Sequence, residues 1–173
     1  GTNEVPALAA ESPARPVALG RSAAFRRILG RAEVGAAVGA LLIWVVFAIA
    51  YWDVAPWWML AAPAALHVVA ILGFLWLAWA YPRDPEARSN EAWRWLYITC
   101  AGLTGIAYGG GGALLFHLPH PEPRILVAAC LALTAALAPG RIYEPRSYVA
   151  FAGINLSLLA VAAFLSDDKM SLA

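Results

Sequence analysis

The chain has 173 residues, of which 62% are hydrophobic and only 13% are charged. This composition is far more apolar than that of an ordinary soluble domain, so it excludes a water-soluble globule and indicates a chain surrounded by lipid. The formal net charge of +1 gives no overall field that would attract nucleic acid, and we expect no nucleic-acid partner.

Two segments precede the apolar stretches. Residues 1–20 are rich in Ala and Pro and have no periodic apolar face, which predicts an extended N-terminal arm. The arm has no secretory signal pattern, so we do not expect it to direct export. Residues 21–33 interleave arginines with apolar residues, which predicts a basic interfacial helix or, alternatively, a positive flank for the first span. The arginines expected at headgroups or a partner are Arg26, Arg27 and Arg31.

Apolar stretches then fill residues 34–165, and each predicts a transmembrane helix, since crossing the hydrocarbon core takes about 20 residues. The expected spans are 34–51, 57–81, 93–116, 125–138 and 148–165, of which the fourth is short for a full crossing. The expected fold class is all-α, a polytopic membrane helix bundle of about five transmembrane helices with short loops. Residues 166–173 are expected to form a polar C-terminal tail.

The third stretch, from Trp93 to Phe116, is expected to be the central helix. Its glycines recur every three or four residues, so one helix face carries almost no side chain and a neighbouring backbone can approach closely. The glycines expected to pack in this way are Gly102, Gly105, Gly109 and Gly112, with Gly35 and Gly39 in the first span. The run 109–112 is not a phosphate loop, because no Lys-Ser/Thr follows it; a pocket for a lipid or a flat ring is the alternative to close packing.

Tryptophans gather near the ends of the expected spans, as in the aromatic belts of membrane proteins. Those expected at the interface or against a partner are Trp57, Trp58, Trp76 and Trp79. Trp44 is the exception, because it lies inside a span.

His67 is the only ionisable residue well inside an expected span, which makes it a functional candidate. A neutral imidazole there could be an axial ligand of haem or of a chlorin, could relay a proton, or could simply bond to a neighbouring helix. His117 and His120 lie roughly 10–15 Å away in depth, at 1.5 Å rise per residue, which argues against a paired haem site.

No other pattern points to chemistry. His117 and His120 could be half of a metal site, but Pro119 and Pro121 spoil their geometry and no third ligand is near in sequence, so we expect no metal. Both cysteines lie in apolar runs, as packing residues do. Because the sequence has no catalytic triad, carboxylate pair or nucleotide fingerprint, we expect a non-catalytic protein.

Basic residues beside the expected spans fall mostly on one side of the membrane. By the positive-inside rule, the N-terminus, the 82–94 loop and the 140–147 loop are cytoplasmic. Only Arg124 and Lys169 fall on the other side. The expected location is the bacterial cytoplasmic (inner) membrane, with the C-terminus periplasmic.

Three motifs carry a resemblance to a known class of protein. They are Trp93-Arg-Trp95 after a basic loop, Gly102-Leu-Thr-Gly-Ile-Ala-Tyr-Gly109 ending in Leu-Leu-Phe116, and Tyr143-Glu-Pro-Arg-Ser-Tyr-Val-Ala-Phe151. From residue 57 onward the chain resembles the N-terminal multi-span membrane region of bacterial sensor histidine kinases and diguanylate cyclases. The resemblance implies a sensory input module that signals through helix packing. No output domain follows, so the chain is either a fragment or a free-standing relative.

The second hypothesis is an accessory structural subunit of a larger membrane complex, energy-converting or light-harvesting. The missing output domain and the many expected lipid-facing aromatics favour it, since such side chains can pack on partner helices or pigments. The expected partners are therefore the lipid bilayer and other membrane subunits or a second copy of the chain.

Overall fold

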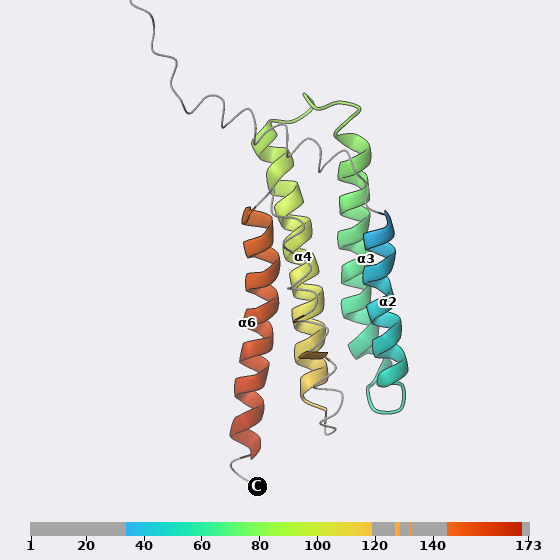
Figure 1. Ribbon diagram of the computed structural model, residues 1–173, viewed down its shortest axis with the longest axis vertical. Helices are drawn as coiled ribbons and strands as arrows, with labels where there is room; N and C mark the ends of the chain where they lie inside the picture. Colours follow the sequence, from blue (N-terminus) through green and yellow to red (C-terminus); the bar gives the residue numbers. More distant parts are fainter. Residues whose placement is uncertain (1–33, 119–126, 129–131, 133–144, 171–173) are drawn as a thin grey trace, which may run out of the picture.

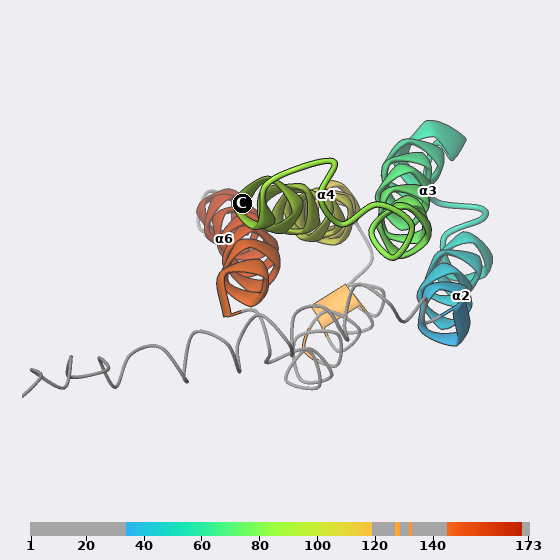
Figure 2. The same cartoon turned by 90° about the horizontal axis from the view of Figure 1, so that it is seen from above.

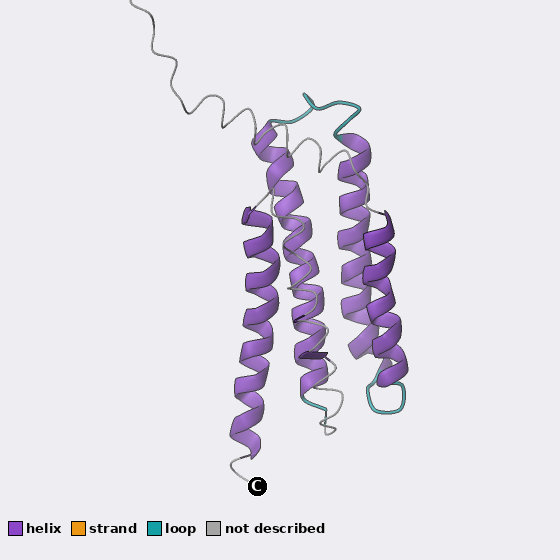
Figure 3. Cartoon of the chain, viewed as in Figure 1, coloured by secondary structure: helices purple, strands orange, loops and turns teal. Residues whose placement is uncertain are grey.

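The computed structural model describes residues 34–118, 127–128, 132 and 145–170, and it describes side chains for residues 41–118, 127–128, 132 and 145–165. This part is helical and contains no strand (Figure 3). Its long helices are α2 (Val34–Ala50), α3 (Trp57–Ala80), α4 (Asn90–Phe116) and α6 (Pro145–Met170).

Three of these helices are long and apolar enough to cross a membrane: Trp57–Ala80, Asn90–Phe116 and Pro145–Leu165. The prediction is therefore confirmed in its coarse form, an all-helical bundle in the described residues with three helices that could cross a membrane. α2 is apolar throughout, but its 17 residues are slightly fewer than the about 20 that a full crossing takes. The fourth expected span lies outside the described residues except for 127, 128 and 132, so a count of five spans stays a prediction.

Two helices extend beyond the apolar stretches that predicted them. α4 begins at Asn90 rather than Trp93, because the Ser89 Oγ accepts a hydrogen bond from the Ala92 N–H at 3.2 Å and caps the first turn. α6 begins at Pro145, where a missing amide donor costs nothing, and its helix continues to Met170 through the expected polar tail. Hydropathy marks where lipid begins, whereas a helix can continue into the headgroup layer.

α4 is the central helix of the described part. α3 packs on one side of it and α6 on the other, while α2 lies against α3 (Figures 1 and 2). An ion pair of 3.3 Å between Arg146 and Glu91 joins the start of α6 to the start of α4. These two helices therefore run parallel, and the glycine-rich helix contacts a neighbour on either side.

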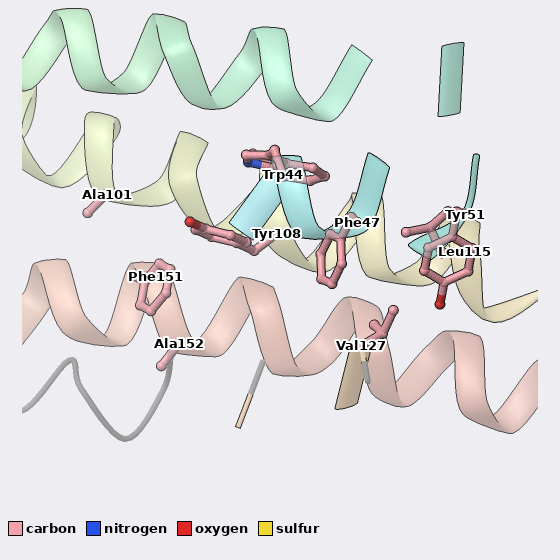
Figure 4. Close-up of a cluster of buried hydrophobic side chains, with 10 residues drawn as sticks. Trp44, Phe47, Tyr51, Ala101, Tyr108, Leu115, Val127, Phe151 and Ala152 are labelled. Carbon is pink, nitrogen blue, oxygen red and sulfur yellow. The ribbon is translucent and has the colours of Figure 1, made fainter. Parts of the chain in front are cut away.

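Buried side chains form two clusters. The larger includes Trp44 and Phe47 of α2, Tyr51 directly after this helix, and Tyr108 and Leu115 of α4 (Figure 4). The smaller lies near the loop between α3 and α4 and contains Leu77, Tyr81, Trp93 and Tyr97. The outer faces are also apolar: Ile49, Val149 and Phe164 are 75%, 66% and 72% exposed. Apolar side chains on the outside as well as the inside are what a lipid-facing bundle requires.

Candidate functional site

Trp44, His67 and Tyr108 form a buried aromatic triad that joins α2, α3 and α4. The Trp44 Nε1–H donates a hydrogen bond of 2.9 Å to the His67 Nδ1. The indole lies nearly parallel to the Tyr108 ring, with centroids 5.7 Å apart and an interplanar angle of 11° (Figure 4). The Tyr108 and His67 centroids are 4.7 Å apart. Trp44 is thus a core residue, which explains why it alone departs from the belt pattern.

Gly111 provides the space for this triad. A Cβ added to Gly111 would lie 2.6 Å from the Trp44 Cη2 and 3.0 Å from the Pro63 Cβ. Only a residue without a side chain lets α2 and α3 approach α4 here. The sequence indicated Gly111 only as part of the run 109–112, for which close packing was one of two interpretations, and it gave no partner, because Pro63 and Trp44 are 48 or more positions away in the chain.

The same hydrogen bond decides which nitrogen of His67 carries the proton. An indole N–H can only donate, so Nδ1 must accept, and in the neutral imidazole the proton then lies on Nε2. A haem or chlorin ligand needs a nitrogen with a free lone pair, and neither nitrogen offers one in this arrangement. The residues around His67 therefore do not fit the axial-ligand hypothesis.

Glycines of α4 make direct backbone contact with α6. A Cβ at Gly105 would lie 2.7 Å from the Phe151 carbonyl oxygen, and a Cβ at Gly109 would lie 2.8 Å from the Asn155 Cα. At Gly102 it would lie at an ordinary 3.6 Å from the Ile154 Cδ1. Gly105 and Gly109, four residues apart, meet Phe151 and Asn155, also four apart, which is the geometry of a small-xxx-small contact between helices.

Asn155 is fully buried at this contact, with a relative exposure of 0%. Within the described part of the chain, neither its amide nitrogen nor its amide oxygen has a hydrogen-bond partner. Leaving a buried polar group unsatisfied costs roughly 1–3 kcal/mol, so among the described residues the Asn155 amide is a destabilising group at the α4–α6 contact.

The remaining candidates fall into three groups. Gly112 is buried on α4. Gly35 and Gly39 lie in α2, but their burial is outside what the structure describes. The predictions for Arg26, Arg27, Arg31 and His120 also fall outside the described residues. His117 is exposed just after α4, and no three His, Cys, Asp or Glu side chains of the described part gather as metal ligands would. The interface tryptophans are exposed, at 78% for Trp57, 47% for Trp58, 42% for Trp76 and 57% for Trp79.

Comparison with known proteins adds no family: no family model, curated protein or solved structure matches the chain.

Proposed function

We propose that the protein is a non-catalytic sensory input module of a bacterial cytoplasmic membrane, and that it signals by a change in packing between α4 and α6. The observation that carries the proposal is the direct contact of Gly105 and Gly109 with the α6 backbone, with the Asn155 amide inside it, for which the described residues offer no hydrogen-bond partner. The resemblance in sequence to the membrane regions of sensor kinases and cyclases supports the same function.

A switch needs two packings that differ by only a few kcal/mol. The glycine face has no large side chains to lock one register of α6, so a shift along α4 meets little steric resistance. The buried amide raises the energy of the observed register, and a displacement that gives Asn155 a partner recovers that energy. Both features bring a second packing closer in free energy to the first.

The arrangement of charge supports the proposed orientation. Every arginine that the structure describes lies at the end of the bundle that holds the 81–89 loop, namely Arg83, Arg88, Arg94 and Arg146. By the positive-inside rule this end is cytoplasmic.

The packing change is testable by spin labels on the outer faces of the two helices. We would label Ile106→Cys on α4 and Val149→Cys on α6, both exposed, with Cys100 and Cys130 replaced by Ser. In lipid nanodiscs we expect two populations of distance, which differ by up to about one helical turn of 5 Å. Asn155→Leu should leave a single population. One narrow distance, unchanged by Asn155→Leu, would contradict the proposal.

The exposed tryptophans favour a second candidate, an accessory structural subunit of a larger membrane complex. Trp57 and Trp79 lie near opposite ends of α3 and are mostly exposed, so they offer large flat surfaces to partner helices or pigments. Mass spectrometry after gentle extraction from the native membrane separates the two. Stoichiometric companion subunits with a chain near 18.4 kDa support the subunit. A much larger parent chain supports the input module.

A further inference from the structure

The loop of residues 81–89, between α3 and α4, is held in place by Trp93. This indole is 1% exposed, and its Nε1–H donates a hydrogen bond of 3.1 Å to the Pro85 carbonyl oxygen. The Tyr81 ring lies edge-on to it with centroids 5.5 Å apart. The loop therefore has a defined position at the end of the bundle.

Two arginines of this loop are stacked on tryptophans. The Arg88 Cζ lies 5.3 Å from the Trp76 ring centroid and 5.1 Å from that of Trp93. The Arg83 Cζ lies 4.3 Å from the Trp79 centroid, and its Nη1 donates a hydrogen bond of 2.7 Å to the Trp79 carbonyl oxygen. Stacking uses the flat face of a guanidinium and leaves N–H groups at its edge to bind an anion.

Neither stacked arginine forms an ion pair with a carboxylate of the described residues. Glu91, near the start of α4, instead pairs with Arg94 at 2.9 Å and with Arg146 at 3.3 Å. Asp84 and Glu86 are exposed on the same loop, yet neither makes an ion pair with Arg83 or Arg88. The loop thus presents two positioned positive charges that pair with no carboxylate of the described residues.

We propose that Arg83 and Arg88 bind the phosphate of an anionic lipid headgroup. Their tryptophan partners belong to α3, a helix apolar enough to span the membrane, so the loop lies at the depth of the headgroups. Trp76 and Trp79, 42% and 57% exposed, offer an apolar surface just below the arginines for the acyl chains. These exposed apolar side chains next to the arginines favour a lipid over a soluble phosphate.

The test is binding of phosphatidylglycerol to the full chain in detergent, measured by native mass spectrometry and by the rise in the thermal unfolding midpoint. Phosphatidylcholine serves as the neutral lipid. A basic residue near an anionic surface contributes about a fivefold factor in affinity, so Arg83→Gln and Arg88→Gln should each weaken binding about fivefold. Arg146→Gln, at the same end but paired with Glu91, is the matched control and should change binding less than twofold.

Three results would overturn the proposal: equal binding of the two lipids, an equal loss in the Arg146→Gln control, or full competition by millimolar glycerol phosphate, which would indicate a soluble ligand. Arg88→Lys keeps the charge without the flat guanidinium, so its binding should lie between wild type and Arg88→Gln. If Arg88→Gln fails to fold, Arg88→Lys and Arg83→Gln decide the outcome.

Discussion

A single hydrogen bond between Trp44 and His67 links α2 to α3, and Tyr108 of α4 covers both rings. In the sequence, the role of each residue is ambiguous, because a tryptophan and a histidine inside an apolar span each have several possible roles. Together they explain each other, because the indole supplies the donor that the imidazole needs at depth. The triad therefore provides a hydrogen-bonded contact between helices inside an apolar core.

Trp44→Phe removes the donor and leaves the His67 Nδ1 unsatisfied. Hydrogen bonds between membrane helices contribute about 0.6 kcal/mol on average and up to about 1.7 kcal/mol, so we expect a loss of about 1–2 kcal/mol once the missing ring volume is included. Unfolding of the purified chain by dodecyl sulfate in mixed micelles measures it. Trp95→Phe, at a ring 55% exposed, is the control and should change stability by less than about 0.5 kcal/mol. If the two variants lost equal amounts of unfolding free energy, the triad would have no special role in stability.

Asn155→Leu exchanges an amide that has no hydrogen-bond partner among the described residues for an apolar group of similar size. The free energy of unfolding should rise by about 1–3 kcal/mol, because the penalty for the buried polar atoms disappears. The same unfolding assay measures the change, with Ser157→Ala at an exposed position of α6 as the control. A loss of stability in Asn155→Leu would mean that the amide does have a partner.

At the scale of the helix, the glycines of α4 divide between two faces. Gly105 and Gly109 contact α6, while Gly111 contacts Trp44 and Pro63. Spacing in the sequence predicted a glycine face on this helix because the period of a helix is local information. It could not predict the second face, since that contact depends on where the side chains of α2 and α3 reach. The sequence also could not predict which helix each glycine face contacts.

Alanine substitutions should change stability in opposite directions at a glycine in a helix contact and at a glycine with open space around it. At Gly105 a Cβ would lie 2.7 Å from the Phe151 carbonyl oxygen, so Gly105→Ala should separate the helices and cost about 1–3 kcal/mol. At Gly110 a Cβ would meet no atom of the described residues within 4 Å, so Gly110→Ala should instead stabilise by about 0.5–1 kcal/mol through helix propensity. Unfolding midpoints of the two variants measure the contrast. Shifts of the same sign would contradict the close α4–α6 contact.

The role of His67 could not be predicted from the sequence. A lone intramembrane histidine left an axial ligand, a proton relay and a structural bond open, and nothing in the sequence shows that the Trp44 indole donates to this imidazole. The indole donor makes Nδ1 an acceptor, and this argues against the ligand role in the observed arrangement. No spacing rule connects residues 44 and 67, because the bond crosses between two helices.

For the whole molecule, the membrane class followed from composition alone, whereas the number of spans and the direction of insertion need the arrangement in space. α3 and α4 meet at the arginine-bearing end, and the turn of residues 51–56 lies at the opposite end (Figure 1). The turn contains Asp53 and no basic residue. This asymmetry is the physical basis for the expected orientation, because arginines resist transfer across the membrane.

Orientation can be read from two exposed aspartates, Asp53 in the turn and Asp84 in the loop at the arginine end. With Cys100 and Cys130 replaced by Ser, Asp53→Cys should react with a membrane-impermeant maleimide in intact bacterial cells, because the positive-inside rule places that turn outside. Asp84→Cys should react only after the membrane is opened. Solubilised protein, in which both variants must react, controls for accessibility. The reverse pattern would place the arginine end outside and would remove the route from the α4–α6 contact to a cytoplasmic partner.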